Sequence, residues 1–453
     1  MLRLTWVQPE DLLGHELRQA RLDGREPSAI EARWRAAGGT DAPERAGASA
    51  HRASRYLRLL AEDLLDELAD LPGTLADDEP RDLAAIRSRC PNWPAERLAA
   101  DLTPAALEAA WLGRAIGCLL GKPVEKLPLD ALRALAEAAG NRPLTGYFTA
   151  VGVPAELLGR HPWNRRSAAT SLAENIDGMP EDDDLDYPLL NLLLLQRHGK
   201  TFTTADVARL WLDELPPGRT FTAERVTHRN LLSGIEPPHT ARHRNPFREW
   251  IGALIRADMH GWTHPGDPAG AAEQAYRDAV LSHTANGVYA AMFTAAVIAT
   301  AATGRHDVHA CLRTGRSVVP PRSRLARAID HALRLARDTA DFDDVVDELH
   351  AVYGPDHHWV HAIPNTALIA AALAHADGDF TGSIGRAVAG GWDTDSAGAT
   401  AGSVAGLLAG RPAALPEHWR APLKNRLATT VADFDGTGFD TLAHLTHLEA
   451  VRP

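Results

Sequence analysis

Cysteine is scarce in this chain of 453 residues, which contains only Cys90, Cys118 and Cys311. None of them lies in a Cys-x-x-Cys pair, so the sequence offers no disulfide framework. Such a count is typical of a reducing compartment, and we expect a cytoplasmic location. The N-terminal segment also lacks the apolar stretch and small-residue cleavage site of a secretory signal.

Long hydrophobic runs and an excess of positive charge are missing as well. No stretch of about 18 apolar residues occurs, so we expect neither a transmembrane helix nor a membrane partner. Lysine and arginine number 47 against 59 aspartate and glutamate residues, which gives a formal net charge of −12. A chain this acidic is not expected to bind nucleic acid.

Strand patterns are few, because alternating β-branched runs are rare and no Asn-Gly turn joins two of them. Abundant alanine, leucine and arginine favour helices instead. We therefore expect an all-α fold of many helices. Residues 1–99 are predicted to form a helical N-terminal extension, with leucines recurring near a 3.6-residue period over 54–71. Residues 100–453 are predicted to form the main helical domain.

Two short acidic clusters are the strongest functional signal. The first runs from Glu181 to Asp186 and contains five acids in six residues. The second is Asp393-Thr394-Asp395-Ser396, followed by glycines at every fourth position from 398 to 410. Carboxylates crowded in this way repel one another, and a hard divalent cation is the simplest counter-charge. Because acids also favour helix starts, simple capping is the alternative interpretation of both clusters.

A third segment runs from Gly113 to Glu125. Its glycines at 113, 117 and 121 would form one bare stripe on a helix, which permits a ligand or another helix to approach the backbone. Gly117 and Gly121 are therefore candidate substrate contacts, with tight helix packing as the alternative. Pro123 is expected to end the helix and leave Glu125 on a loop, where it is a candidate general base.

Four isolated residues are further candidates for substrate binding: Arg256, His283, Asn286 and Trp392. Arg256 suits a phosphate, or equally a buried carboxylate. His283 and Asn286 lie in a polar stretch at a helix boundary, and Trp392 directly precedes the second acidic cluster. No P-loop, dinucleotide-binding glycine motif or serine nucleophile elbow occurs.

Taken together, the three segments resemble the ADP-ribosylglycohydrolase family, which includes the dinitrogenase-reductase-activating glycohydrolase. The resemblance rests on the order of the glycine helix ending in Pro123-Val124-Glu125, the acids from Glu181 to Asp184, and the motif from Asp393 to Ser396. It covers about residues 108–410. It implies that residues 100–453 form an all-α catalytic domain, a compact orthogonal bundle of helices. It also implies two magnesium ions, or manganese, at the bottom of a cleft. It also implies cleavage of the bond between ADP-ribose and an acceptor, on a protein or a small molecule.

The resemblance assigns roles to residues that match the family motifs. The implied metal ligands are Asp182, Asp183, Asp393, Asp395 and Ser396, and Glu181 offers a further carboxylate. Glu125 matches the family's mobile glutamate near the scissile bond. Asp183, an acid of the metal cluster, is the second candidate for proton transfer.

Three departures from the family pattern bear on specificity. Glu181 and Asp184 replace the threonines of the usual Thr-Asp-Asp-Thr motif, which adds negative charge. Cys118 replaces an aspartate that often follows the glycine equivalent to Gly117, and a thiol is a poor hydrogen-bonding substitute for a carboxylate. The Gly-Asn-Gly loop common near the distal ribose is not evident around Gly252. These changes are consistent with a different acceptor, or with a small ADP-ribosyl or nucleoside-like metabolite.

The principal expectation is a metal-dependent hydrolase of an ADP-ribosyl or related ribosyl bond. One alternative is an ADP-ribose- or nucleotide-binding protein on the same fold without turnover, which Cys118 and the altered acidic motif would suit. Another is a metal-dependent phosphohydrolase, because paired acid clusters also serve phosphoryl transfer. We expect no lysine or arginine packed beside the acids, which argues against that alternative. The sequence does not fix the oligomeric state.

Overall fold

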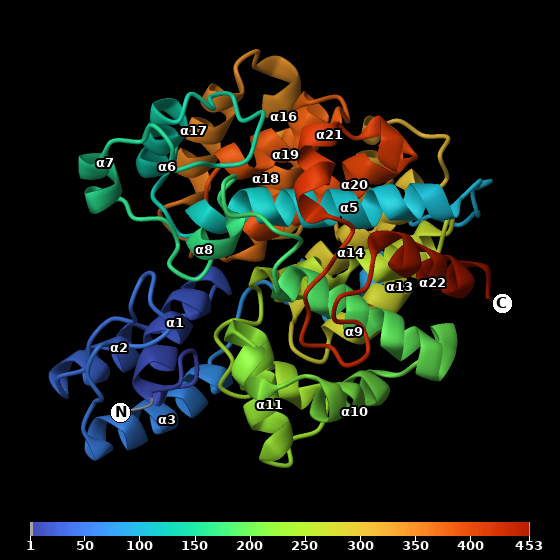
Figure 1. Ribbon diagram of the computed structural model, residues 1–453. Coiled ribbons are helices and arrows are strands. Elements are labelled where there is room, and N and C mark those ends of the chain that lie inside the picture. Colours follow the sequence, from blue (N-terminus) through green and yellow to red (C-terminus); the bar gives the residue numbers. More distant parts are fainter. Residues whose placement is uncertain (1–2, 453) are drawn as a thin grey trace.

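The computed structural model describes residues 3–452, and this part of the chain is almost entirely helical (Figure 1). It contains twenty-two α-helices and seven short 3-10 helices. Over residues 3–452, β pairing is limited to two isolated bridges, Met179 with Leu427 and Trp250 with His361. The all-α prediction is confirmed. None of the helices in this range is long and apolar enough to cross a membrane.

Four α-helices precede residue 100, and they are α1 (Pro9–Leu22), α2 (Ser28–Ala36), α3 (Arg55–Asp70) and α4 (Leu83–Arg89). The next group is α5 (Pro104–Gly121), α6 (Leu129–Ala138), α7 (Ala155–Arg160), α8 (Ala168–Ser171), α9 (Asp183–His198), α10 (Thr204–Glu214), α11 (Thr222–Leu232), α12 (Asp258–Trp262) and α13 (Pro268–Ala279). The last group is α14 (Ala285–Ala301), α15 (Val308–Ser317), α16 (Arg324–Asp338), α17 (Phe342–Tyr353), α18 (Ala362–His375), α19 (Phe380–Ala389), α20 (Thr394–Ala409), α21 (Glu417–Arg420) and α22 (Phe439–Val451).

The 3-10 helices are single turns or short links between these elements. They are η1 (Lys122–Val124), η2 (Gly199–Thr201), η3 (Pro217–Arg219), η4 (His239–Ala241), η5 (Ile251–Arg256), η6 (Pro412–Ala414) and η7 (Ala421–Leu423). Three of them, η1, η3 and η5, border the cleft described below.

Helix starts follow the capping residues of the sequence. The Ser54 side chain accepts a hydrogen bond from the backbone N–H of Leu57 and begins α3, which buries its leucine face. Thr103 caps α5 in the same way, with Pro104 at the first helical position. A side-chain oxygen at this place satisfies one of the free N–H groups of the first turn. Local sequence therefore sets where these helices begin.

The centre of the molecule is the pair formed by α5 and α20, which lie side by side (Figure 1). Their glycine stripes face each other at backbone contact. A β-carbon on Gly117 would lie 1.9 Å from the carbonyl oxygen of Gly398, and one on Gly121 would lie 2.2 Å from that of Thr394. Real β-carbons do not approach this closely, so only glycine permits the packing. Of the two interpretations of this stripe, the structure supports helix packing.

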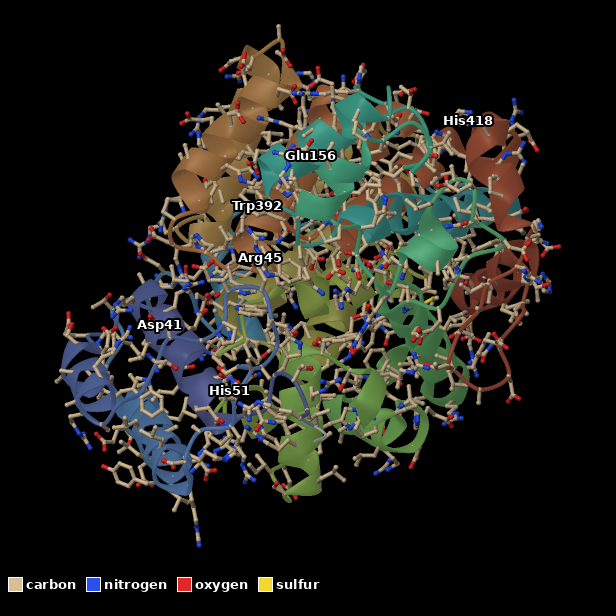
Figure 2. The ribbon with its side chains drawn as sticks, turned by 60° about the vertical axis from the view of Figure 1, so that its left-hand side comes forward. Asp41, Arg45, His51, Glu156, Trp392 and His418 are labelled. Atoms are coloured by element: carbon tan, nitrogen blue, oxygen red, sulfur yellow. The ribbon has the colours of Figure 1, made fainter. Side chains whose placement is uncertain are left out.

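The N-terminal extension packs against the rest of the chain through buried ion pairs as well as apolar contacts (Figure 1). Arg248 donates hydrogen bonds to Glu16 at 2.6 Å and to Asp23 at 2.7 Å. Within the extension, the loop between α2 and α3 is tied to the N-terminal segment, since the Trp6 N–H donates to the Gly47 carbonyl at 2.6 Å. Figure 2 marks Asp41, Arg45 and His51 along this loop. The boundary near residue 99 stays a prediction.

Replacing Gly117 by alanine is expected to destabilise the protein by about 3 kcal/mol or more, because α5 and α20 would have to move apart. Gly159 in α7 is the matched control, since a β-carbon there would meet nothing within 4 Å. Its replacement by alanine is expected to be neutral or stabilising by up to about 1 kcal/mol. Urea denaturation of both variants measures the difference. Equal stability of the two would contradict the packing account.

Stability is also expected to fall with acidification below neutral pH. Burial, aided by Arg18, lowers the pKa of His15 from 6.5 to about 3. Between pH 6.5 and pH 3 the His15 side chain is protonated in the unfolded chain but not in the folded one. This contribution to the free energy of unfolding is therefore fully present above pH 6.5 and declines as the pH falls toward 3. At pH 5 this one histidine costs about 2 kcal/mol.

Thermal unfolding of His15→Phe at pH 7 and pH 5 measures that contribution. The variant is expected to lose less stability on acidification than the parent protein. His51 is exposed, so His51→Phe should keep the full pH dependence. An unchanged slope in His15→Phe would show that this histidine is not the titrating group.

Candidate active site

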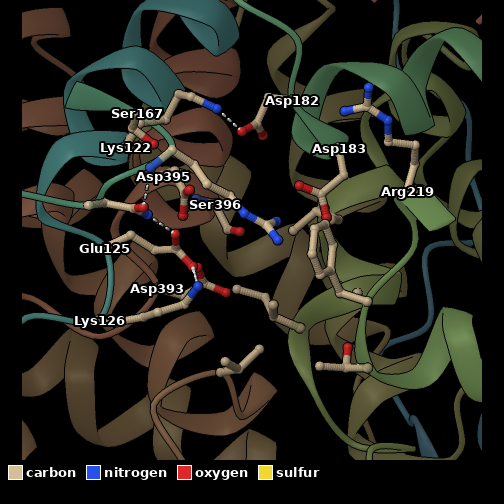
Figure 3. A pocket seen from close by; sticks show the side chains of 18 of the residues that line it. Lys122, Glu125, Lys126, Ser167, Asp182, Asp183, Arg219, Asp393, Asp395 and Ser396 are labelled. Carbon is tan, nitrogen blue, oxygen red and sulfur yellow. Dashed lines mark hydrogen bonds and ion pairs between the residues drawn. The ribbon is translucent and has the colours of Figure 1, made fainter. Parts of the chain in front are cut away.

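The acidic motifs predicted from the sequence meet in one cleft of about 600 Å³ (Figure 3). Its walls include η1, which follows α5, the loop before α9, η3, η5 and the start of α20. Seven predicted residues line it: Glu125, Glu181, Asp182, Asp183, Asp393, Asp395 and Ser396. The structure therefore brings together segments that are more than 200 residues apart in the sequence.

Glu125, Asp393 and Asp395 form a compact group on one wall of the cleft. One carboxylate oxygen of each lies within 4.8 Å of the others. Glu125 follows η1 directly and is held by Asn164, whose side-chain amide donates to it at 2.7 Å. The backbone N–H of Asp393 donates to the Asn365 side chain at 3.2 Å, where α20 begins. Three hard oxygen donors converging in this way fit a divalent cation such as Mg²⁺.

Crowding of buried carboxylates raises the pKa values of the aspartates on this wall. Burial raises the pKa of Asp393 well above its ordinary value, and neighbouring Asp395 and Glu125 raise it further. Burial, with Glu125 and Asp182, raises the pKa of Asp395 to about 7. A cation placed among these groups would favour their ionised forms and lower both pKa values.

Asp182 and Asp183 lie on the facing wall at the start of α9 (Figure 3). Asp182 caps this helix, since its side chain accepts a hydrogen bond from the Asp184 N–H at 2.9 Å. Asp183 forms no ion pair with any residue of the described chain. Burial and the carboxylates of Asp182 and Asp184 raise the pKa of Asp183 well above its ordinary value.

Basic side chains accompany the other acids of this wall, contrary to the sequence-based expectation. Lys122 forms an ion pair with Asp182 and is 7% exposed. Burial alone would lower the pKa of Lys122, but the Asp182 carboxylate raises it above its ordinary value. Arg219 lies 3.0 Å from Glu181. The expectation that no lysine or arginine packs beside the acids is therefore wrong, because these bases come from η1 and η3.

The two departures that add negative charge are each neutralised. Asp184 lies 3.2 Å from Arg114, a fully buried residue of α5 that also reaches Asp258 at 2.9 Å. Glu181 has Arg219 as described above. The altered acidic motif thus adds ion pairs, and it does not leave the cleft with uncompensated charge.

Cys118 lies behind the α9 acids, with its sulfur 3.9 Å from an Asp184 carboxylate oxygen. Burial raises the pKa of this thiol well above its ordinary value, and Asp182 and Asp184 raise it further. The group therefore stays protonated. One donor atom each of Cys118, Asp182 and Asp184 also lies within 4.8 Å of the others. A neutral thiol among carboxylates that already have basic partners does not fit a hard cation.

Six predicted substrate contacts lie outside the lining of the cleft, namely Gly117, Gly121, Arg256, His283, Asn286 and Trp392. The two glycines are covered by α20, as described above. Arg256 is 1% exposed and pairs with Glu224 at 2.9 Å and Asp278 at 2.6 Å. Its guanidinium therefore satisfies buried carboxylates, which was the alternative to a phosphate contact.

The other three of these residues also have interior partners. His283 is buried and its Nδ1 lies 2.8 Å from the Ser282 hydroxyl. Asn286 donates to Glu79 at 2.9 Å, in the junction with the N-terminal extension. Trp392 stacks on His350, with ring centroids 4.1 Å apart. Their positions give no support to direct substrate contact.

Several cleft residues were not identified from the sequence. Asn164, Lys122 and Arg219 lie in loops or 3-10 turns, where no periodicity marks them. Trp6 reaches the cleft from the N-terminal extension, outside the part of the chain that resembles the family. Only the position of Lys122, three residues before Glu125, was a usable signal.

Convergent carboxylates in a cleft are the kind of ligand set that hydrolytic enzymes use to hold divalent metals, and this all-α chain has such a cleft. The chain belongs to the ADP-ribosylglycohydrolase family, whose model matches residues 101–450. The family is hydrolytic, and the chain is accordingly a glycosidase-like hydrolase.

A solved structure described as an ADP-ribosylglycohydrolase-related protein complex is similar to this chain at 21% identity and a TM-score of 0.48. The similarity covers 77% of this chain and 99% of that one. No curated protein sequence matches the chain.

Replacing Arg256 by methionine is expected to destabilise the fold by about 3 kcal/mol or more, because Glu224 and Asp278 would be left buried without a counter-charge. Arg219 is the matched control, since its side chain is 55% exposed. Arg219→Met is expected to change stability by less than about 1 kcal/mol. Chemical denaturation measures both. An Arg256→Met variant as stable as the parent protein would contradict the structural role and favour a ligand contact for Arg256.

Proposed function

We propose that this hydrolase cleaves the glycosidic bond of an ADP-ribosyl group carried by a protein or a small molecule, with a divalent cation bound in the cleft. The observation that carries the proposal is the convergence of Glu125, Asp393 and Asp395 within 4.8 Å in a member of this family. The three free and buried cysteines suit a reducing, cytoplasmic setting for this reaction.

The proposed metal is Mg²⁺, with Mn²⁺ as the alternative, because the donors are hard oxygens. Glu125, Asp393 and Asp395 would hold it, and the Ser396 hydroxyl lies beside them in the lining. When bound, such an ion supplies positive charge that orients ribose hydroxyls and water. The sequence predicts two ions, and their number is taken up in the next subsection.

Glu125 is the proposed general base. It is partly exposed at the cleft wall, and Asn164 and Lys126 fix its carboxylate at 2.7 Å and 2.9 Å. Asp183 faces it across the cleft and is the second candidate for proton transfer (Figure 3). Cleavage of a glycosidic bond passes through an oxocarbenium-like transition state, which nearby carboxylates stabilise.

The remaining lining suits the rest of an ADP-ribosyl ligand. Lys126, Arg166 and Arg219 supply positive charge for a diphosphate. Trp6, Phe221 and Trp359 offer aromatic surface for an adenine ring. The ligand would therefore extend from the carboxylates toward these groups.

A metal-dependent phosphohydrolase is the second candidate function. The basic residues Lys122 and Arg219 beside the acids favour it, because such groups stabilise transferring phosphoryl oxygens. Product analysis separates the two reactions, since one releases intact ADP-ribose and the other releases phosphate or nucleotide. A binding protein without turnover would bind ADP-ribose and yield neither product.

Calorimetric titration with ADP-ribose, in magnesium and after chelation, tests the proposal. Binding is expected in magnesium, and chelation or Asp393→Ala is expected to weaken it at least tenfold by removing the cation or one of its ligands. Asp307 is the matched control, because it is an exposed aspartate at the N-cap position of α15, as Asp393 is at the N-cap position of α20. Asp307→Ala should bind as the parent protein does.

A parallel assay follows release of ADP-ribose from ADP-ribosylated arginine and related conjugates. Metal-dependent release that Asp393→Ala abolishes is the expected result. Absence of ADP-ribose binding under either condition would refute the ligand class. Release of phosphate in place of ADP-ribose would establish the second candidate function.

A further inference from the structure

The basic partners are distributed unequally between the two walls of the cleft. On the α9 wall, Lys122 pairs with Asp182, Arg219 with Glu181 and Arg114 with Asp184. Asp183 and Asp186 form no ion pair within residues 3–452, and Asp186 lies outside the cleft lining, where Thr429 and Thr430 donate hydrogen bonds to it.

On the other wall, Asp393 and Asp395 form no ion pair with any lysine or arginine of the described chain. Lys126 reaches only Glu125, at 2.9 Å, and its side chain is 40% exposed. Two buried carboxylates are thus left without a fixed counter-charge, which is costly unless a mobile cation supplies one. The need for an external ion is concentrated on this wall.

Lys122 is placed to act as a built-in cation. Its ammonium group forms an ion pair with Asp182 and lies 3.4 Å from the Glu181 carbonyl oxygen (Figure 3). Its backbone is fixed between Gly121, which packs on α20, and Pro123, which restricts the chain. The side chain is 7% exposed, so water screens the charge of its ammonium group only weakly.

We propose that the Lys122 ammonium takes the cation position beside Asp182, so that the cleft holds one divalent ion, at Glu125, Asp393 and Asp395, in place of two. This inference rests on the proposed metal site. Asp182 is then a positioning residue, which holds Lys122 and caps α9. The double-ion site implied by the sequence motifs does not fit the charges that this chain places on the α9 wall.

Repulsion between like charges explains why the Lys122 ammonium group and a divalent ion cannot both lie beside Asp182. A divalent ion bound to Asp182 would lie against the ammonium group in a poorly solvated site, where repulsion is weakly screened. The neighbouring thiol of Cys118 offers no compensating hard ligand. Displacing Lys122 from Asp182 would remove the ion-pair partner of a buried ammonium group, which is costly.

Equilibrium dialysis against Mn²⁺ alone, followed by atomic emission, measures the number of ions per chain in the full-length protein. One ion is expected for the parent protein and two for Lys122→Met, with the second binding at least tenfold tighter than any weak second site of the parent. Lys122→Arg keeps the charge and is expected to bind one. Lys126→Met removes a different lysine of the same cleft and is also expected to bind one.

Two ions of similar affinity in the parent protein would overturn the inference and leave the proposed hydrolase intact. One ion in a folded Lys122→Met would overturn it too, because the lysine would not be what excludes the second ion. Two ions in Lys126→Met would show that overall charge, and not the position of Lys122, sets the number. No bound ion in the parent protein would refute this inference together with the metal-dependent function. The count in the parent protein does not depend on whether a variant folds, so two ions there overturn the inference by themselves.

Discussion

The close packing of α5 on α20 is the constraint on which the site depends. Gly117 against Gly398 and Gly121 against Thr394 bring the two backbones into contact. That contact places the end of one helix beside the start of the other. Glu125, four residues beyond the end of α5, therefore meets the carboxylates that open α20. Side chains larger than hydrogen on the stripes would separate the two groups of ligands.

Charge compensation is the second constraint, because the same packing buries many acids. Three basic residues from different elements form ion pairs with these acids: Arg114 in α5, Lys122 in η1 and Arg219 in η3. These pairs cost desolvation and stabilise little by themselves. Their effect is to decide which carboxylates remain available. Of the acids that line the cleft, Asp183, Asp393 and Asp395 form no ion pair within residues 3–452, so a ligand or ion would have to supply their counter-charge.

Much of the fold and part of the site could be predicted from the sequence, for identifiable reasons. Leucine periodicity marked α3, and Pro123 marked the end of α5, because these signals are local. The acidic motifs were found because their residues are contiguous. Arg256 and Trp392 show what local patterns cannot supply. Whether an arginine meets a phosphate or a buried carboxylate depends on partners such as Glu224 and Asp278, which only the tertiary structure brings near.

The same reasoning applies to residues that substitute for a family motif. From the sequence alone, Glu181 and Asp184 are interpreted as added negative charge, because their arginine partners are 38 and 70 residues away along the chain. In the structure each substitution is half of an ion pair, so the acid and its base form one unit. Cys118 fits the same unit, since a buried neutral thiol beside Asp184 adds no further charge. The departures from the family pattern are thus coupled to one another, and together they describe a cleft whose α9 wall supplies its own cations.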